Sequence, residues 1–165
     1  MKRVAILYSE YSPLVDAIKY RLSDCDADVI TSLSENNEYD LVVLAGFNGE
    51  YKGNALKCHH SLLPAFESDE PERDAILFGA KVTGVSIYYT NPKKIVAQYP
   101  VFIKSETHFD DLKQELEYIE QTLYPLVIEK ILKNEPFDTE ELLSKNSACC
   151  CSSTSCEGSC IGCNH

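Results

Sequence analysis

The first part of the chain consists of short apolar runs separated by polar segments. Residues 3–8 and 41–45 are nearly continuous apolar runs, as is typical of strands covered on both faces. Shorter stretches at 28–31 and 55–58 predict two more strands. A helix start at Ser12 is followed by apolar residues at helical spacing: Leu14, Ala17, Ile18 and Leu22. This alternation predicts an open, mostly parallel α/β sheet flanked by helices.

The second part of the chain predicts a helix, a hairpin and a long helix. An acidic, proline-containing start at 68–71 predicts a helix that ends at Gly79. Residues 81–90 and 95–102, joined by a turn at Asn91-Pro92, predict two antiparallel strands. Thr107 is then expected to cap a long helix that Pro125 kinks. Its apolar stripe contains Leu112, Leu116, Ile119, Leu123 and Leu126.

Three segments follow from this pattern. Residues 1–133 form the predicted α/β domain, and 134–146 form a linker with a short helix near 139–143. Residues 147–165 have too little apolar bulk for a core, so they are expected to be a tail unless a metal ion folds them.

Composition and charge narrow the classes of partner. The 165 residues are enough for one sizeable core, and their formal net charge is −11. An acidic surface repels phosphate backbones and anionic lipid heads, which argues against general nucleic-acid binding and membrane binding. The first apolar run ends at Ser9 and Glu10, too early for a signal peptide, and no run approaches the roughly 20 residues of a membrane helix. We therefore expect a cytoplasmic protein.

The cysteines are concentrated in the tail. Of the 8 cysteines, 6 lie there, close to a terminal histidine: Cys149, Cys150, Cys151, Cys156, Cys160, Cys163 and His165. Thiolates are soft ligands, so this cluster predicts an iron–sulfur cluster or zinc in a reducing compartment. A redox-sensitive tail with adventitious disulfides is the alternative. The spacing does not separate iron–sulfur from zinc.

The segment 57–66 holds the candidate for chemistry. His59 is expected where a strand meets a stiff Leu-Leu-Pro turn, and ligand sites lie at the carboxyl ends of such strands. An imidazole titrates near neutral pH, so it can donate or accept a proton. A lone histidine is more often structural, and the neighbouring His60 could equally be a surface residue.

The octad 57–64, Lys-Cys-His-His-Ser-Leu-Leu-Pro, resembles the Asn-x-His-Pro-Ser-Leu-Leu-Pro signature of folate-dependent formyltransferases. Segments 39–47, 83–89, 95–98 and 120–125 are similar to further motifs of that family, in the same order. The resemblance runs to about residue 132. It implies a Rossmann-like fold and formyl transfer from 10-formyltetrahydrofolate to an amine.

The resemblance also implies roles for individual residues. His59 matches the family's histidine, Lys57 stands at its asparagine, and Asn91 falls at its aspartate; these three are the predicted catalytic residues. The predicted folate-binding residues are Leu44, Gly46, Phe47, Asn48 and Gly84.

Three departures from the family pattern keep a second interpretation open. Lys57 replaces a fixed amide dipole with a flexible cation. The loop 8–13 lacks the family's phosphate-binding glycines and contains Glu10, so glycinamide ribonucleotide is not the expected acceptor. An amide at Asn91 cannot take a proton as a carboxylate does. The alternative is therefore a catalytically inactive module that binds a metal or a protein partner through its tail.

Overall fold

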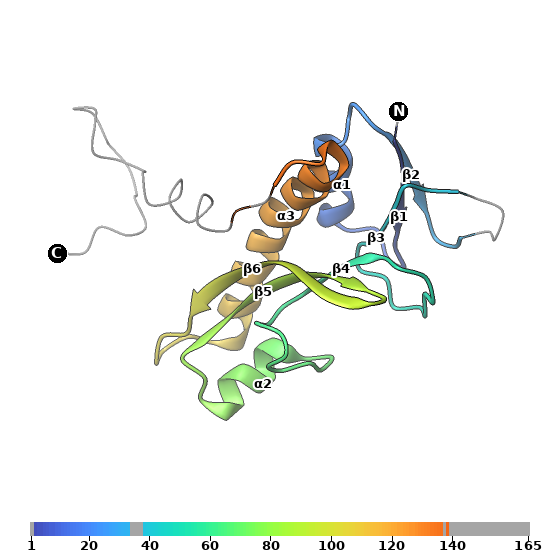
Figure 1. Ribbon diagram of the computed structural model, residues 1–165. Coiled ribbons are helices and arrows are strands. Elements are labelled where there is room, and N and C mark those ends of the chain that lie inside the picture. The colour runs from blue at the N-terminus through green and yellow to red at the C-terminus, as the bar shows by residue number, and fades with distance from the viewer. Residues whose placement is uncertain (1, 34–37, 137, 139–165) are drawn as a thin grey trace, which may run out of the picture.

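The computed structural model describes residues 2–33, 38–136 and 138 (Figure 1). One six-stranded sheet, ordered β2-β1-β3-β4-β5-β6, organises these residues together with three helices. The elements in chain order are β1 (Arg3–Leu7), α1 (Pro13–Arg21), β2 (Asp26–Ile30), β3 (Leu41–Leu44), β4 (Leu56–His59), α2 (Pro71–Phe78), β5 (Val82–Thr90), β6 (Lys93–Phe102) and α3 (Phe109–Lys133).

The direction of the strands divides the sheet into two parts. Strands β2, β1, β3 and β4 are parallel, whereas β5 runs antiparallel to β4 and forms a hairpin with β6. In Figure 1 the hairpin crosses α3, with α2 at the end of α3 far from α1. The predicted open, mostly parallel α/β sheet is confirmed.

The main core lies between the sheet and two helices. Alternate residues of a strand point to opposite faces, so Val4 and Ile6 of β1 pack toward α1 and α3. Leu56 of β4 and Tyr124 of α3 belong to the same cluster and are fully buried. The Tyr124 hydroxyl lies 2.6 Å from the carbonyl oxygen of Leu56 and 3.1 Å from that of Leu44, so it joins α3 to both strands.

The opposite face of the sheet has a different cover. Ala5, Leu7, Val42 and Leu44 are buried there beneath loop side chains that include Tyr39, Phe47 and Tyr51. Of the described residues between β2 and β4, none is helical. The cluster contains no residue of a described helix, so we call this side of the sheet the helix-free face; aromatic side chains from loops close it.

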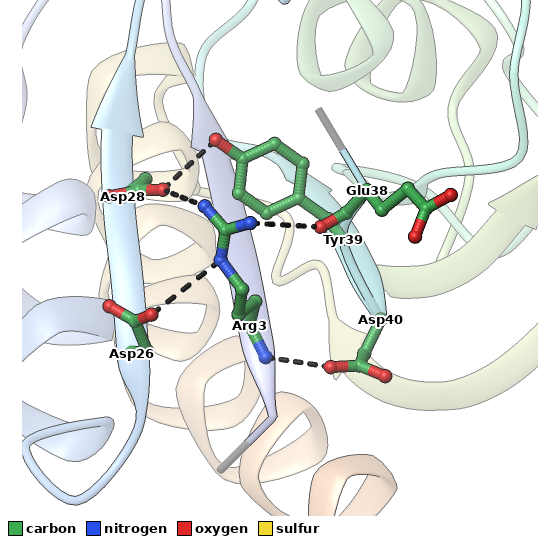
Figure 2. Close-up of polar contacts among 6 residues, drawn as sticks. All are labelled: Arg3, Asp26, Asp28, Glu38, Tyr39 and Asp40. Atoms are coloured by element: carbon green, nitrogen blue, oxygen red, sulfur yellow. Dashed lines mark hydrogen bonds and ion pairs between the residues drawn. The ribbon is translucent and has the colours of Figure 1, made fainter. Parts of the chain in front are cut away.

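A polar network joins the amino ends of the parallel strands (Figure 2). The Arg3 guanidinium lies 3.6 Å from Asp26 and 3.3 Å from Asp28, both on β2. Tyr39 donates a 3.0 Å hydrogen bond to Asp28, and the guanidinium lies 5.0 Å from the centre of the Tyr39 ring. The main-chain N–H of Arg3 donates to Asp40 over 2.7 Å. These contacts link β1 to β2 and to the segment that leads into β3.

Several predicted boundaries differ from the structure. β2 begins at Asp26, before the predicted start at 28, because Asp26 pairs with Arg3 of β1 in the parallel sheet and also through its carboxylate. The predicted Thr107 cap is wrong: His108 is the N-cap of α3, and the Thr107 hydroxyl accepts a hydrogen bond from the N–H of Lys104. The helix continues through Pro125 to Lys133. The helix predicted near 139–143 lies outside the described residues.

Candidate functional site

A cavity of about 510 Å³ lies at the carboxyl ends of β3 and β4. Six predicted site residues line it: Leu44, Gly46, Phe47, Asn48, Lys57 and His59. Cys58, His60, Glu72, Lys113 and Glu120 are also part of its wall. Its volume is that of a small-molecule site. A second cavity of about 550 Å³, under the loops of the helix-free face, is lined by Leu33, Glu38, Tyr39, Asp40, Val42 and Tyr51 and brings no predicted site residue together.

Strand β4 sends its side chains to two sides of the sheet. Leu56 and Cys58 face α3, whereas Lys57, in register with Leu44, belongs to the helix-free face. His59 has the same parity as Lys57 and is paired with Ser86 of β5. The two predicted catalytic side chains of β4 therefore share one side.

The orientation of His59 is set by the main chain. Its Nε2 lies 3.0 Å from the carbonyl oxygen of Phe66, a residue with a positive φ of 51°. A carbonyl only accepts, so Nε2 carries the proton in the neutral ring and Nδ1 keeps its lone pair. Nδ1 is thus the atom that can take up a proton.

The turn that follows His59 is held by a buried hydrogen-bond group. The Ser86 hydroxyl donates to the carbonyl of Ser61 over 2.6 Å and accepts from the N–H of Leu63 over 3.0 Å. Gln98 donates to the Leu63 carbonyl and to the Ser86 hydroxyl. Residues of β5 and β6 therefore hold the Ser-Leu-Leu-Pro turn in place. These strands contain segments 83–89 and 95–98, so the three family-like motifs are joined by hydrogen bonds.

A carboxylate that the sequence analysis did not single out lies on the His59 side. Glu67 directly follows Phe66 and forms an ion pair with Lys93 of β6. The hydrogen bond from Lys93 is the main reason that the pKa of Glu67 is lowered, and Lys57 contributes less. The Lys93 ammonium also lies 5.4 Å from the centre of the Tyr88 ring. This side of β4 thus carries cationic and anionic groups around His59.

The other side of β4 carries a buried ionic triad of His60, Glu72 and Glu120. His60 Nδ1 lies 2.5 Å from Glu72 of α2, and Nε2 lies 2.9 Å from Glu120 of α3. The side chains of His60, Glu72 and Glu120 are 16%, 8% and 17% exposed. A neutral ring has one N–H, so two carboxylate partners require the imidazolium. Burial opposes this charge, yet the bonds to Glu120 and Glu72 raise the pKa of His60 to about 10.

The triad changes two expectations from the sequence. His60 is not a surface residue; it stands where the family signature has proline, and that substitution was the signal for a new role. Burial, together with the nearby Glu120, raises the pKa of the Cys58 thiol well above its ordinary value. Cys58 is therefore a protonated thiol near neutral pH rather than a nucleophilic thiolate.

Asn91 and Gly84 do not line the cavity. The side-chain amide of Asn91, at the β5–β6 turn, donates to the Lys52 carbonyl over 3.4 Å. Gly84 packs against β6, where an added Cβ would lie 2.1 Å from the carbonyl oxygen of Tyr99. The structure thus offers a packing reason for Gly84, and the predicted roles of both residues stay predictions.

The tail residues Cys149–Cys151, Cys156, Cys160, Cys163 and His165 lie outside the described residues, so their metal binding stays a prediction. Within residues 2–33, 38–136 and 138, no group of three or more histidine, cysteine or acidic side chains is arranged to hold a metal ion. None of the helices in this part of the chain is long and apolar enough to cross a membrane. The cytoplasmic location also remains a prediction.

The fold and the cavity define an α/β protein with a cavity of ligand size at the carboxyl edge of its parallel strands. Comparison with known proteins then identifies the family. The model of the formyl transferase family, described as "Formyl transferase", matches residues 9–128. This chain belongs to that family.

Individual relatives agree with this assignment. The chain is 31% identical over 110 residues to phosphoribosylglycinamide formyltransferase of Bacillus subtilis (strain 168), covering 58% of this chain and 55% of that protein. It is 32% identical over 106 residues to the enzyme of that name from Mycobacterium tuberculosis (strain CDC 1551 / Oshkosh), covering 57% and 49%. The chain thus spans about half the length of the curated relatives it matches.

A solved structure extends the likeness to three dimensions. The crystal structure of phosphoribosylglycinamide formyltransferase from Bacillus halodurans superposes with a TM-score of 0.64 at 26% identity. The match covers 83% of this chain and 100% of that one. The fold predicted from the sequence motifs is therefore the fold of this family.

Proposed function

We propose that this chain transfers a formyl group from 10-formyltetrahydrofolate to an amine. The observation that carries the proposal is His59, whose Nε2–H is engaged by the Phe66 carbonyl while Nδ1 remains available beside a cavity of ligand size. Family membership supports the donor, and the short span of the match leaves the acceptor to be identified.

The reaction assigns balanced roles to two side chains. The folate supplies an activated formyl group. His59 Nδ1 accepts the proton that the amine loses as its nitrogen bonds to the formyl carbon, and it returns a proton to the folate nitrogen as the old C–N bond breaks. Lys57 is the candidate to stabilise negative charge on the formyl oxygen, as a flexible cation in place of an amide dipole. The products are a formamide and tetrahydrofolate.

Of the other predicted site residues, some line the cavity and some do not. Leu44, Gly46, Phe47 and Asn48 line the cavity and are our candidates for contact with the folate. Asn91 lies at the β5–β6 turn outside the cavity lining, and Glu67 is the carboxylate beside His59. Asn91→Ala tests the predicted catalytic role of Asn91: a fall in formyl transfer would support it, and an unchanged rate would leave Glu67 as the carboxylate to test.

The test is tetrahydrofolate release from 10-formyltetrahydrofolate with a panel of small amines. We expect amine-dependent release that His59→Ala lowers by about 10²-fold or more. His108→Ala, at the exposed start of α3, is the matched control and should not change the rate. Release that is equal in the His59→Ala protein, or absent with all amines although tetrahydrofolate binds, would count against catalysis.

The second candidate is an inactive module that acts through its tail as a metal-binding or partner protein. The substitutions at Lys57 and Asn91 and the six tail cysteines favour it. Zinc or iron–sulfur binding by Cys156, Cys160 and Cys163 predicts stoichiometric metal after anaerobic purification, measured by elemental analysis. Serine at these three positions should remove it. Metal-free protein that takes up neither zinc nor an iron–sulfur cluster on reconstitution would eliminate this candidate.

A further inference from the structure

The ionic triad gives one wall of the cavity an unusual chemistry. Both ring nitrogens of His60 are occupied by the carboxylates of Glu72 and Glu120, so the imidazolium has no N–H left for a ligand. Two carboxylates and one imidazolium leave a net charge of −1 in a poorly hydrated place. Such a wall repels an anion and attracts a cation.

The loop after β1 and the first turn of α1 carry two further carboxylates, Glu10 and Asp16, outside the lining of the cavity. The Ser9 hydroxyl accepts from the N–H of Asn48 over 2.9 Å, and the N–H of Ser9 donates to the carbonyl of Gly46. The loop therefore lies against the cavity wall. Glu10 follows directly, and Asp16 in the first turn of α1 accepts a 2.7 Å hydrogen bond from Tyr11. The amino end of α1, which would otherwise favour an anion, is already supplied with carboxylates.

The two lysines of the cavity, Lys57 and Lys113, lie at different distances from the acidic triad wall. Lys57 lies on the His59 side of β4, on the other side of the strand from Cys58. Burial raises the pKa of Glu72, but the bond from His60, together with smaller effects that include the nearby Lys113, lowers it overall. Asp69 also lines the cavity, so Lys113 does not reverse the sign of the triad wall. The cavity thus has a cationic side at Lys57 and an acidic side at Glu72 and Glu120.

We propose that the acceptor is an amine with a second, cationic nitrogen and no phosphate, of the diamine or polyamine class. This inference rests on the proposed function. The carboxylates of Glu72 and Glu120 bind the ammonium end, and the other nitrogen, in its neutral form, is presented to His59. The proton balance of formyl transfer is unchanged, because the bound ammonium does not react.

The experiment compares three amines of one length: 1,3-diaminopropane, propylamine and 3-aminopropyl phosphate. Binding to the full chain is measured by calorimetry, and formylation is measured separately by tetrahydrofolate release. The variants are Glu120→Gln and, as a matched control on the exposed face of α3, Glu115→Gln. His60→Gln provides an opposite change, because it removes the positive charge and leaves both carboxylates. Circular dichroism checks that each variant is folded.

We expect 1,3-diaminopropane to bind more tightly than the other two amines. Glu120→Gln should weaken its binding by about tenfold, Glu115→Gln should not, and folded His60→Gln protein should bind it more tightly. The inference is overturned if 3-aminopropyl phosphate binds more tightly than 1,3-diaminopropane, or if the Glu120→Gln protein binds 1,3-diaminopropane with unchanged affinity. Diamine binding without formylation would support a diamine site at the triad wall but would reject the proposed function and, with it, the acceptor role. Formylation of propylamine or 3-aminopropyl phosphate without diamine binding would retain the proposed function and overturn the inference.

Discussion

Replacing His60 with glutamine is predicted to remove a stability term that depends on pH. The folded pKa of His60 is raised from 6.5 to about 10 by its bonds to Glu120 and Glu72, against the opposing effect of burial. Each pKa unit corresponds to about 1.4 kcal/mol, so the rise is worth about 5 kcal/mol in the free energy of unfolding. That is a large part of the roughly 5–15 kcal/mol by which a domain is stable.

The sign of this effect follows from proton uptake. Because the folded pKa lies above the unfolded one, the stabilisation is complete below pH 6.5. Between pH 6.5 and about 10 the folded state binds one proton more, so the free energy of unfolding falls by about 1.4 kcal/mol per pH unit from this group. Above pH 10 the contribution is gone.

The assay is urea unfolding of the wild-type and His60→Gln proteins at intervals from pH 6 to pH 10. Lysine, tyrosine and cysteine titrate in both proteins, so the difference between the two curves isolates His60. It should shrink steadily with rising pH, whereas His108→Gln should give a flat difference. A flat difference for His60→Gln would refute the reasoning. If that protein is unfolded, an NMR titration of the wild-type His60 ring decides: loss of the imidazolium signal near pH 7 would refute it equally.

Three further predictions concern the fold. Tyr124→Phe should lower the free energy of unfolding in urea by about 1–3 kcal/mol, because two buried main-chain carbonyls lose their bond to the hydroxyl. Tyr118→Phe, which changes an exposed ring on the same helix, should lower it by less than about 0.5 kcal/mol. Gly84→Ala should cost about 3 kcal/mol and speed amide exchange in β6, since its Cβ would lie 2.1 Å from the Tyr99 carbonyl oxygen; unchanged exchange would contradict this. Arg3→Met should cost about 1 kcal/mol at low salt and less at high salt, because the pairs it breaks are partly exposed; a loss independent of salt would exclude ion pairing as its origin.

The sequence allowed much of the sheet to be predicted because burial on both faces produces continuous apolar runs. Strands β1 and β3 were found in this way, and the alternation of β5 with its Asn-Pro turn identified the hairpin. The place of His59 at the end of β4 followed from the Leu-Leu-Pro turn. These features depend on neighbours in the chain.

The triad could not be predicted in the same way. Glu72 lies 12 residues and Glu120 60 residues from His60, so their meeting depends on how α2 and α3 pack against the end of β4. The position of Glu67 has a similar origin, since its partner Lys93 comes from β6. Local patterns do not encode the distances between such groups. The substitution of proline by His60 in the signature marked the place but not the partners.

The contact between His59 and the Phe66 carbonyl has a consequence for how this loop can vary. Every amino acid has a main-chain carbonyl, so the proton on Nε2 is held by a group that point mutation does not delete. Residue 66 can therefore change its side chain without loss of the imidazole tautomer, provided that the new residue accepts a φ near 51°. Asparagine and glycine tolerate that conformation well, whereas β-branched residues do not. Sequence drift at this position is thus limited by backbone conformation rather than by side-chain chemistry.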